Sequence, residues 1–317
     1  MFIGCVAPAR LIKPVSDGKG PVLVPTQRIR SRDNRRSQRF RSRYGPWALV
    51  TGASDGIGKA VAAEIAAQGV NVVLCARRLD RLETIAADLA TAHGVQIRVV
   101  TADLVQPGGV DQLVQETRHL DIGLVILSAG FATSGPFADA AVTPELEMVC
   151  LNVTVVTRLA HTFAQRMVNN GHGGIVLVGS ILGRQGVPWV SCYAATKAYV
   201  RVLAEGLHQE LKTRGIHVLA VEAGPVHTGF EARAGLKYGS AARPEVVAKA
   251  VIAALGKRAS VIPGVRARLL ATSMALLPRR LRVRFLGEVM HRMRAAATSV
   301  PPAGSPSDTP RRCPSEL

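Results

Sequence analysis

Three side chains that could move a proton or hold an oxygen lie close together in the sequence. Tyr193 and Lys197 are four residues apart, and Ser180 lies thirteen residues before the tyrosine. If the segment is helical, the four-residue step puts the phenol and the ammonium on one face, a turn apart. A nearby ammonium favours the phenolate, so it should lower the pKa of a hydroxyl that otherwise titrates near about 10. The pattern predicts that Tyr193 exchanges a proton with a carbonyl oxygen held by Ser180.

A glycine-rich segment ahead of these residues indicates a nucleotide site. The apolar run 46–50 leads into residues 51–58, which read TGASDGIG, and apolar or small residues then recur at steps of three and four up to Gly69. A strand, a glycine turn and a helix direct backbone N–H groups and a positive helix end at a pyrophosphate. Glycine is needed where a Cβ would block the phosphates or the turn. The spacing differs from Gly-x-Gly-x-x-Gly, so the prediction depends on the place of the loop between strand and helix.

The end of the next apolar run indicates which dinucleotide would bind. Residues 70–76 read as a second strand that stops at Arg77 and Arg78. An acid at this position binds the ribose 2′-hydroxyl, whereas arginine accommodates a 2′-phosphate. Arg77 can pair with phosphate through its planar guanidinium, with Ser54 and Arg78 as helpers. NADP(H) is therefore the preferred cofactor, and NAD(H) is the alternative.

With these residues, the chain resembles the short-chain dehydrogenase/reductase family from about residue 47 to residue 262. The region 51–74 is most similar to the steroid and long-chain 3-oxoacyl reductase branch. The resemblance implies a catalytic tetrad of Asn152, Ser180, Tyr193 and Lys197, in which the asparagine holds a water near the lysine. It implies a set of cofactor-binding residues: Gly52, Ser54, Asp55, Gly56, Ile57, Gly58, Arg77, Arg78, Asp103, Leu104, Ala129, Gly130, Tyr193, Lys197, Pro225, Val226 and Thr228. Ser128 departs from the family's usual asparagine, and we expect it to weaken sheet support more than chemistry.

The resemblance also implies an activity. We expect an NADP(H)-dependent oxidoreductase that interconverts a ketone or aldehyde and an alcohol by hydride transfer, with Tyr193 as acid and base. Lys197 would bind the nicotinamide ribose and depress the tyrosine pKa. The expected pocket residues are Phe230, Leu236, Tyr238, Val187, Pro188 and Trp189, together with the apolar C-terminal segment. This lining favours a hydrophobic substrate such as a steroid, a 3-oxoacyl chain or another lipid-like ketone. The alternative is a nucleotide-binding sensor or scaffold without turnover.

The elements that must position these residues follow from the hydrophobic pattern. Apolar runs alternate with longer helical stretches, at residues 70–76, 95–100, 122–128, 174–178 and 216–221. Continuous apolar strands separated by helices predict an α/β fold: a single Rossmann-type doubly wound parallel sheet with helices on both faces. Residues 143–170 are expected to form one long helix, and residues 191–214 another. Family members are usually dimers or tetramers through two such helices, so a homo-oligomer is expected.

The net charge of +18 is concentrated at the two ends of the chain. Residues 1–44 hold eleven Lys/Arg against two Asp/Glu, residues 257–317 hold twelve against three, and residues 45–256 hold seventeen of each. The catalytic domain, 45–262, is therefore close to neutral, and nucleic acid is not expected as a partner. The arginine-rich segment 1–44 has too few apolar residues to bury a core and is expected to be a disordered arm, although its composition is also that of an organellar presequence.

The segment 263–296 has two interpretations that stay open. Its apolar stretch, residues 269–277, lies between clusters of arginine. The stretch is too short to span a bilayer, which takes about 20 residues, but it suits a helix lying in the membrane interface. The other interpretation is a basic amphipathic helix that closes the substrate pocket or a subunit contact. Residues 297–317, rich in Pro and Ser, are expected to be a flexible tail.

The cysteines and histidines follow no pattern that predicts a disulfide framework or a metal site. The five cysteines, at positions 5, 75, 150, 192 and 313, form no Cys-x-x-Cys pair. An odd and unpatterned set is typical of a reducing compartment, so a cytoplasmic enzyme is expected. The eight histidines show no metal-ligand spacing, and no metal is expected.

Overall fold

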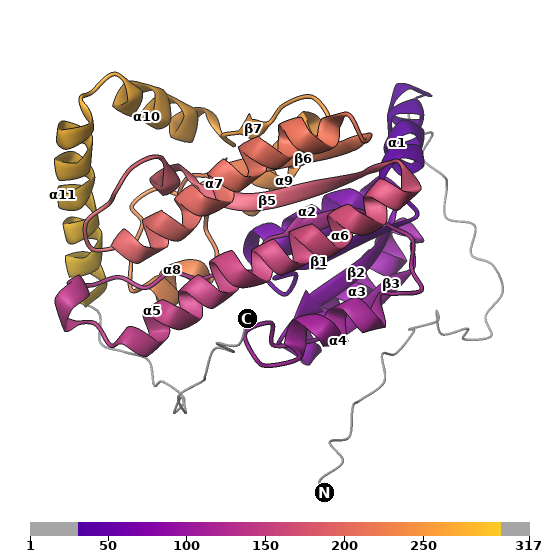
Figure 1. Ribbon diagram of the computed structural model, residues 1–317, viewed down its shortest axis with the longest axis horizontal. Coiled ribbons are helices and arrows are strands. Elements are labelled where there is room, and N and C mark those ends of the chain that lie inside the picture. The colour runs from indigo at the N-terminus through magenta and orange to yellow at the C-terminus, as the bar shows by residue number, and fades with distance from the viewer. Residues whose placement is uncertain (1–30, 299–317) are drawn as a thin grey trace, which may run out of the picture.

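The computed structural model describes residues 31–298 of the 317-residue chain. Seven strands form one sheet (Figure 1): β1 (Trp47–Thr51), β2 (Asn71–Ala76), β3 (Ile97–Thr101), β4 (Ile122–Leu127), β5 (Gly173–Ser180), β6 (Ile216–Ala223) and β7 (Ser260–Val261). All neighbouring strands are parallel, in the order β3-β2-β1-β4-β5-β6-β7. Every residue of β4 and β5 is buried, as expected for strands covered on both faces.

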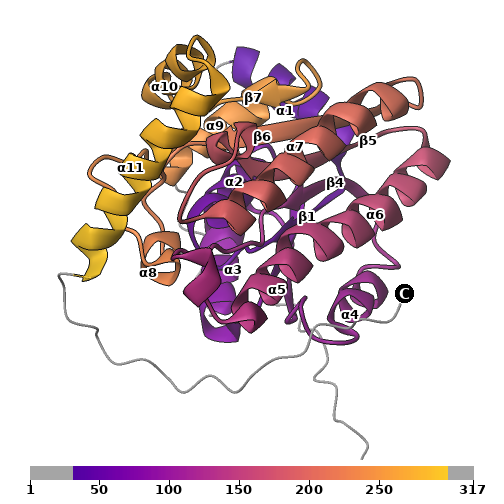
Figure 2. The same ribbon diagram turned by 60° about the vertical axis from the view of Figure 1, so that its left-hand side comes forward.

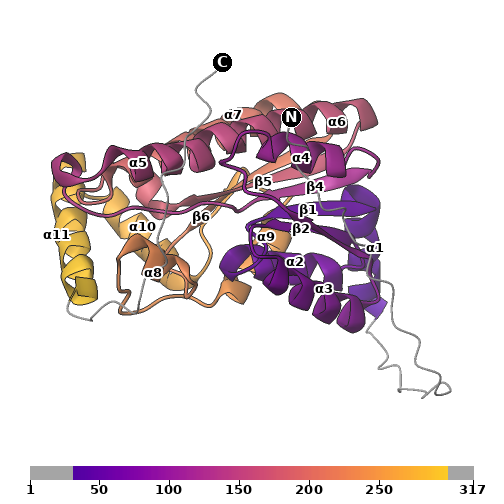
Figure 3. The same ribbon diagram turned by 90° about the horizontal axis from the view of Figure 1, so that it is seen from below.

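Two layers of helices cover the sheet, as Figure 3 shows from below. Their bounds are α2 (Gly56–Ala67), α3 (Leu79–His93) and α9 (Pro244–Ala254) on one face, and α4 (Gly109–Glu116), α5 (Val142–Val149), α6 (Val156–Asn170) and α7 (Ser191–Lys212) on the other. One hydrophobic core lies under α2, α3 and α9, and a second lies under α4, α6 and α7. The predicted α/β fold with a single doubly wound parallel sheet is confirmed.

The strand order reverses between β1 and β4, which is where a doubly wound fold opens a crevice. Thr51, the last residue of β1, ties the two strand ends together. Its Oγ1 accepts hydrogen bonds from the backbone N–H groups of Ser128 and Ala129, both at 3.1 Å. The backbone after β4 is therefore held by a threonine side chain, and the Ser128 side chain takes no part in these bonds.

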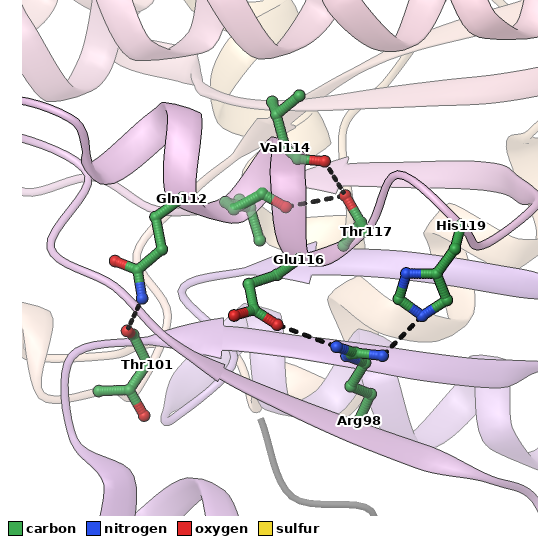
Figure 4. A network of polar contacts seen from close by, with 8 residues as sticks. Arg98, Thr101, Gln112, Val114, Glu116, Thr117 and His119 are labelled. Carbon is green, nitrogen blue, oxygen red and sulfur yellow. Dashed lines mark hydrogen bonds and ion pairs between the residues drawn. The ribbon is translucent and has the colours of Figure 1, made fainter. Parts of the chain in front are cut away.

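A polar network fastens the edge strand β3 to helix α4 (Figure 4). Arg98 donates to Glu116 Oε2 at 2.9 Å, and its Nη1 lies 2.7 Å from Nε2 of His119. Gln112 donates to the main-chain oxygen of Thr101 at 3.3 Å. The network brackets residues 102–108, so the segment that carries Asp103 and Leu104 is anchored at both of its ends.

The helix expected over residues 143–170 contains a change of winding. Helix α5 runs into a π-helical turn, η2 (Cys150–Val155), which continues without a break into α6. A π-helical turn widens the helix by one residue and is frequent at functional sites. Asn152 lies inside this turn and is fully buried. The second expected helix, 191–214, is observed as α7.

The N-terminal arm differs from its expected disorder where the structure describes it. Residues 31–44 form helix α1 (Ser31–Tyr44), and Phe40 and Tyr44 are buried with their rings 4.8 Å apart. The Tyr44 hydroxyl lies 2.6 Å from Nδ1 of His217, at the amino end of β6. The expected disorder is therefore wrong for residues 31–44. Two aromatic residues one turn apart give this segment an apolar face, although arginines dominate its composition. Residues 1–30 lie outside the described residues.

The C-terminal segment forms two helices, α10 (Val265–Ala275) and α11 (Arg279–Thr298). Figure 2 shows them joined at a sharp angle, with α11 running past the short helix α8 (Phe230–Ala234). Two 3-10 turns, η1 (Phe137–Asp139) and η3 (Ile181–Arg184), complete the elements. Within residues 31–298, no helix has the length and apolar content needed to cross a membrane. Of the expected tail 297–317, residues 299–317 lie outside the described part.

Candidate active site

A cavity of about 560 Å³ opens at the carboxyl ends of the central strands. This volume is within the range of about 300–1,000 Å³ that small-molecule sites occupy. The cavity is lined by these residues of the predicted site: Gly52, Ser54, Asp55, Gly56, Ile57, Arg77, Arg78, Asp103, Leu104, Ala129, Gly130, Ser180, Tyr193, Lys197, Pro225, Val226 and Thr228. Two of the predicted residues, Gly58 and Asn152, lie behind this wall. Residues far apart in the chain are thus brought to one site.

The side chains of Ser180 and Tyr193 lie near each other where the carboxyl end of β5 packs against the first turn of α7. Ser180 is the last residue of β5, and its Oγ accepts a hydrogen bond from the backbone N–H of Leu182 at 3.2 Å. Tyr193 lies in the first turn of α7, and both side chains are buried. The Ser180 hydroxyl faces the Tyr193 hydroxyl closely enough to lower the pKa of the phenol. The two hydroxyl groups can therefore contact one oxygen atom of a bound substrate.

Burial governs the titration of the tyrosine and the lysine. It raises the pKa of Tyr193 well above the usual value, the charge of Tyr238 raises it further, and the hydrogen bond from Ser180 lowers it. Burial also lowers the pKa of Lys197 to about 8. Lys197 was expected to lower the pKa of Tyr193, but in the structure burial raises this pKa instead. Desolvation disfavours both charged forms, so at neutral pH the phenol keeps its proton.

The Lys197 ammonium faces the sheet as well as the phenol. Its Nζ donates a hydrogen bond to the main-chain oxygen of Val178 at 2.9 Å and lies 5.7 Å from the centre of the Tyr193 ring. One buried ammonium thus links the body of α7 to β5, two residues before Ser180. This link fixes the distance between the helix that carries the phenol and the strand that carries the serine.

Asn152 is held by the residues around it. Its Nδ2 donates to the main-chain oxygen of Phe131 at 2.9 Å and to Thr196 Oγ1 at 3.1 Å, and its Oδ1 accepts from the Phe131 N–H at 3.2 Å. A Cβ on Gly130 would lie 2.8 Å from Asn152 Oδ1 and 3.5 Å from Lys197 Nζ. Asn152 is therefore a positioning residue that shapes the backbone next to the lysine. Thr196, which ties it to α7, was not predicted.

The glycine loop forms a cradle that larger side chains would fill. Gly52 and Gly56 adopt positive φ angles of 67° and 53°, which disfavour other residues. A Cβ on Gly52 would lie 3.0 Å from the backbone of Ala129, and one on Gly56 would lie 2.5 Å from the Thr228 methyl group. Asp55 caps α2 by accepting a hydrogen bond from the Gly56 N–H at 2.7 Å. The loop and the amino end of α2 thus fit a pyrophosphate.

Two arginines line the cavity after β2. Arg78 donates to Ser54 Oγ at 3.0 Å, and Arg77 lies 3.8 Å from the carboxylate of Asp103. Their side chains are 44% and 45% exposed, so both guanidinium groups can turn toward a ligand. The structure therefore brings together the three residues expected to hold a 2′-phosphate, with Asp103 beside them.

The other end of the cavity is apolar. Phe230, Leu236 and Tyr238 line it as expected. The apolar C-terminal segment lines it through four residues of helix α11: Leu286, Val289, Met290 and Met293. Their spacing of three, one and three residues marks one helical face. This lining agrees with the pocket-closing interpretation of the C-terminal segment, which stays a prediction.

The segment 187–189 holds α11 in place and does not line the cavity, contrary to expectation. A Cβ on Gly287 would lie 2.9 Å from Pro188 Cγ, so the helix and this loop are in close contact. Trp189 has a φ of 70°, which is unusual for a residue with a side chain, and its ring lies 5.2 Å from that of His291. Residues 187–189 therefore pack against the side of α11 that faces away from the cavity, and α11 itself lines the cavity.

Two charged residues in the lining were also missed. Glu147 comes from α5, and Arg233 comes from α8 with its guanidinium 4.0 Å from the centre of the Phe131 ring. No periodicity or motif surrounds either residue, so the sequence offers no pattern that would have identified them.

The family model for short-chain dehydrogenases matches residues 46–238. A 7beta-hydroxysteroid dehydrogenase of Collinsella aerofaciens is 31% identical over 236 residues, covering 72% of this chain and 89% of the relative. A very-long-chain 3-oxoacyl-CoA reductase of Anas platyrhynchos is 33% identical over 185 residues, covering 56% and 58%. The solved structure of a short-chain dehydrogenase from Sphingobium yanoikuyae in complex with NADPH has a TM-score of 0.66 and 34% identity, covering 73% and 93%.

The match covers more than half of the chain and includes the cradle, the strand ends and the helix that carries Tyr193 and Lys197. The relatives of both kinds are oxidoreductases, and the fold is the one that the sequence predicts. The chain therefore belongs to the short-chain dehydrogenase family and is an oxidoreductase.

Proposed function

We propose that this enzyme interconverts a bulky apolar ketone and the corresponding secondary alcohol with NADP(H). The observation that carries the proposal is the position of the Ser180 and Tyr193 hydroxyls in one cavity. They line the same cavity as the glycine cradle on one side and the apolar wall of α11 on the other. A carbonyl between these two parts can contact both hydroxyl groups while its apolar substituents contact Leu286 and Met290.

The residues of the site divide the chemistry between them. NADPH, when bound, supplies a hydride that adds to the carbonyl carbon. Ser180 donates a hydrogen bond to the substrate oxygen as negative charge develops there, a contribution commonly worth about 3–4 kcal/mol in such sites. Tyr193 transfers its proton to the same oxygen, which completes the alcohol. Lys197 holds α7 against β5 and would contact the nicotinamide ribose. Alcohol oxidation follows these steps in reverse.

NADP(H) is preferred because Arg77, Arg78 and Ser54 line the place where a 2′-phosphate would lie. The relative from Sphingobium yanoikuyae was solved with NADPH, which supports the assignment. NAD(H) stays the alternative. The carboxylate of Asp103 lies 3.8 Å from Arg77 and partly neutralises its positive charge.

A steroid or a long 3-oxoacyl chain is the proposed substrate class. The names of the related enzymes from Collinsella aerofaciens and Anas platyrhynchos support these two classes. The cavity wall supports them independently, because Phe230, Leu236 and four residues of α11 offer apolar contacts. Such a wall would gain little from a sugar or a polyol, whose hydroxyl groups it cannot satisfy.

A homodimer or homotetramer is proposed as the assembly. Exposed apolar residues on α5 and α7 offer the contact surface: Val142, Leu146, Tyr199 and Val202. Light scattering after gel filtration would measure the mass in solution, and a monomer would contradict the proposal. The cytoplasm, predicted from the scattered cysteines, stays the proposed location.

The test of the activity is NADPH oxidation with a panel of carbonyl compounds. We expect turnover with steroid ketones and with long-chain 3-oxoacyl thioesters, and little with sugars. Tyr193→Phe should bind NADPH like the wild type but lose turnover, because the ring is kept and the proton donor is removed. If the wild type binds NADPH and reduces no carbonyl compound, the sensor or scaffold alternative is favoured. If Tyr193→Phe retains most of the activity, the role proposed for the phenol is wrong.

A further inference from the structure

Exposed apolar side chains gather on the two C-terminal helices. Thirteen large apolar residues of the described chain are exposed, and six of them lie between positions 265 and 285. Their exposed fractions are Val265 71%, Leu269 63%, Leu270 36%, Leu276 87%, Leu281 49% and Phe285 48%. A concentration of this kind on the surface of a water-facing domain marks an interaction site.

Five of these six side chains lie away from the cavity, and Leu270 lines it. Val265 and Leu269, four residues apart, lie on one side of α10, and Leu276 directly follows this helix. Leu281 and Phe285 are one turn apart on α11. The opposite side of each helix is the buried one, with Ala271 on α10 and Met290 on α11. The outward residues are therefore not required by the core that the same helices complete.

Positive charge surrounds the apolar residues. Residues 257–287 contain eight Lys/Arg and no Asp/Glu. The exposed members within the two helices are Arg266, Arg268, Arg279, Arg280 and Arg284. Alternating arginine and aliphatic or aromatic side chains, with no acid among them, match the chemistry of an anionic bilayer surface, where the head groups are negative and the layer beneath is apolar.

We propose that this surface, which we name the α10–α11 corner and define as residues 265–285, docks on anionic lipid bilayers. Leu269, Leu276, Leu281 and Phe285 enter the interface while the neighbouring arginines contact lipid phosphates. The two helices meet at an angle at one edge of the molecule (Figure 1). Leu270 also lines the cavity, so the docked face and the wall of the active site belong to the same segment.

The proposal is tested with the full chain and vesicles of phosphatidylcholine, with or without phosphatidylglycerol, in a sedimentation assay. We expect binding to the vesicles that contain phosphatidylglycerol and little binding to phosphatidylcholine alone. Raising the salt from about 0.1 M to about 1 M shortens the screening length about threefold and should weaken the binding at least tenfold. The double variant Leu269→Glu with Leu276→Glu should lose at least tenfold in affinity, as should the triple variant Arg279→Glu, Arg280→Glu and Arg284→Glu.

Matched controls test whether vesicle binding depends on this surface or on exposed apolar and basic residues elsewhere in the chain. Phe137→Glu changes an exposed apolar residue in η1, and Arg118→Glu, Lys212→Glu and Arg214→Glu together reverse three exposed cations away from the corner. Both controls should bind vesicles like the wild type. Circular dichroism and thermal unfolding would establish that every variant is folded.

Three outcomes would overturn the proposal. The first is the absence of vesicle binding by the wild type at low salt. The second is unchanged binding in both corner variants, with loss only when residues 1–30 are deleted, which would assign the binding to the other basic end. The third is a smaller solution mass for the Leu269→Glu and Leu276→Glu variant without any change in vesicle binding, which would make the corner a contact between copies of the chain.

Discussion

Lys197 reaches from helix α7 to the main-chain oxygen of Val178 and donates a hydrogen bond at 2.9 Å. The contact lies two residues before Ser180, so the ammonium sets how far the helix stands from the strand. Because Tyr193 is one turn away on the same helix, the phenol and the serine hydroxyl share a common support. Lys197 therefore has a structural role in addition to the proposed contact with the nicotinamide ribose.

The burial of this ammonium predicts a pH dependence of stability. The pKa of Lys197 is lowered to about 8 in the folded chain and is 10.5 in the absence of burial. Between these values the unfolded chain binds more protons, so the free energy of unfolding should rise with pH, by on the order of 3 kcal/mol from this group. Below pH 8 both states are protonated and the contribution is constant.

Lys197→Met should remove this rise. We expect the difference in unfolding free energy between wild type and variant to change across pH 8 to 10.5, with the wild type gaining relative to the variant. Urea unfolding at a series of pH values measures it, and Lys212→Met, an exposed lysine at the end of α7, is the control. A difference that stays constant over this range would mean that the folded pKa is not lowered.

Gly130 predicts a steric requirement beside Asn152. In Gly130→Ala, the new Cβ would lie 2.8 Å from Asn152 Oδ1, so either the asparagine or the backbone after β4 must shift. Overpacking of this kind typically costs about 1–3 kcal/mol, and we expect at least a tenfold loss of kcat. Gly239→Ala, where nothing lies within 4 Å of the added Cβ, should leave both quantities near the wild type. Equal behaviour of the two variants would show that the contact with Asn152 is not limiting.

The sequence predicts the fold and most of the cavity lining because both are expressed in local patterns. Apolar runs mark strands that are covered on two faces, and the four-residue step from Tyr193 to Lys197 marks one helical face. Glycines in the loop mark positions where a Cβ cannot fit. These patterns depend on neighbours in the chain, which the sequence displays directly.

The remaining features depend on tertiary contacts. The position of Asn152 depends on a π-helical turn and on hydrogen bonds to Phe131 and Thr196. No periodicity in the sequence predicts these features. The tyrosine pKa depends on how deeply the phenol is buried, and burial is a property of the whole fold. The segment 187–189 was assigned to the pocket from its proximity in sequence to the tetrad, whereas α11 occupies that position in space.

Helix α1 offers a test of whether the N-terminal segment belongs to the folded body. Phe40 is 8% exposed and packs against the tilted ring of Tyr44 within the hydrophobic core. Phe40→Ala should lower the free energy of unfolding by about 3 kcal/mol, since it deletes a buried aromatic ring, and should leave the KM for NADPH unchanged. Chemical unfolding monitored by circular dichroism measures the change, with Val202→Ala as an exposed control. A loss below about 0.5 kcal/mol, typical of surface positions, would indicate that α1 does not stabilise the domain.

Arg77 predicts the selectivity between the two dinucleotides. Its guanidinium lines the cavity beside Asp103, so Arg77→Ala removes the cation proposed to face a 2′-phosphate. A charge-assisted hydrogen bond is worth about 1.5–3 kcal/mol, so kcat/KM with NADPH should fall about 10- to 100-fold. The value with NADH should change much less, because NADH carries no 2′-phosphate for the arginine to contact. Arg81→Ala, which removes an exposed arginine from α3, is the control. Equal losses with both cofactors would mean that Arg77 supports the fold of the site and does not select the phosphate.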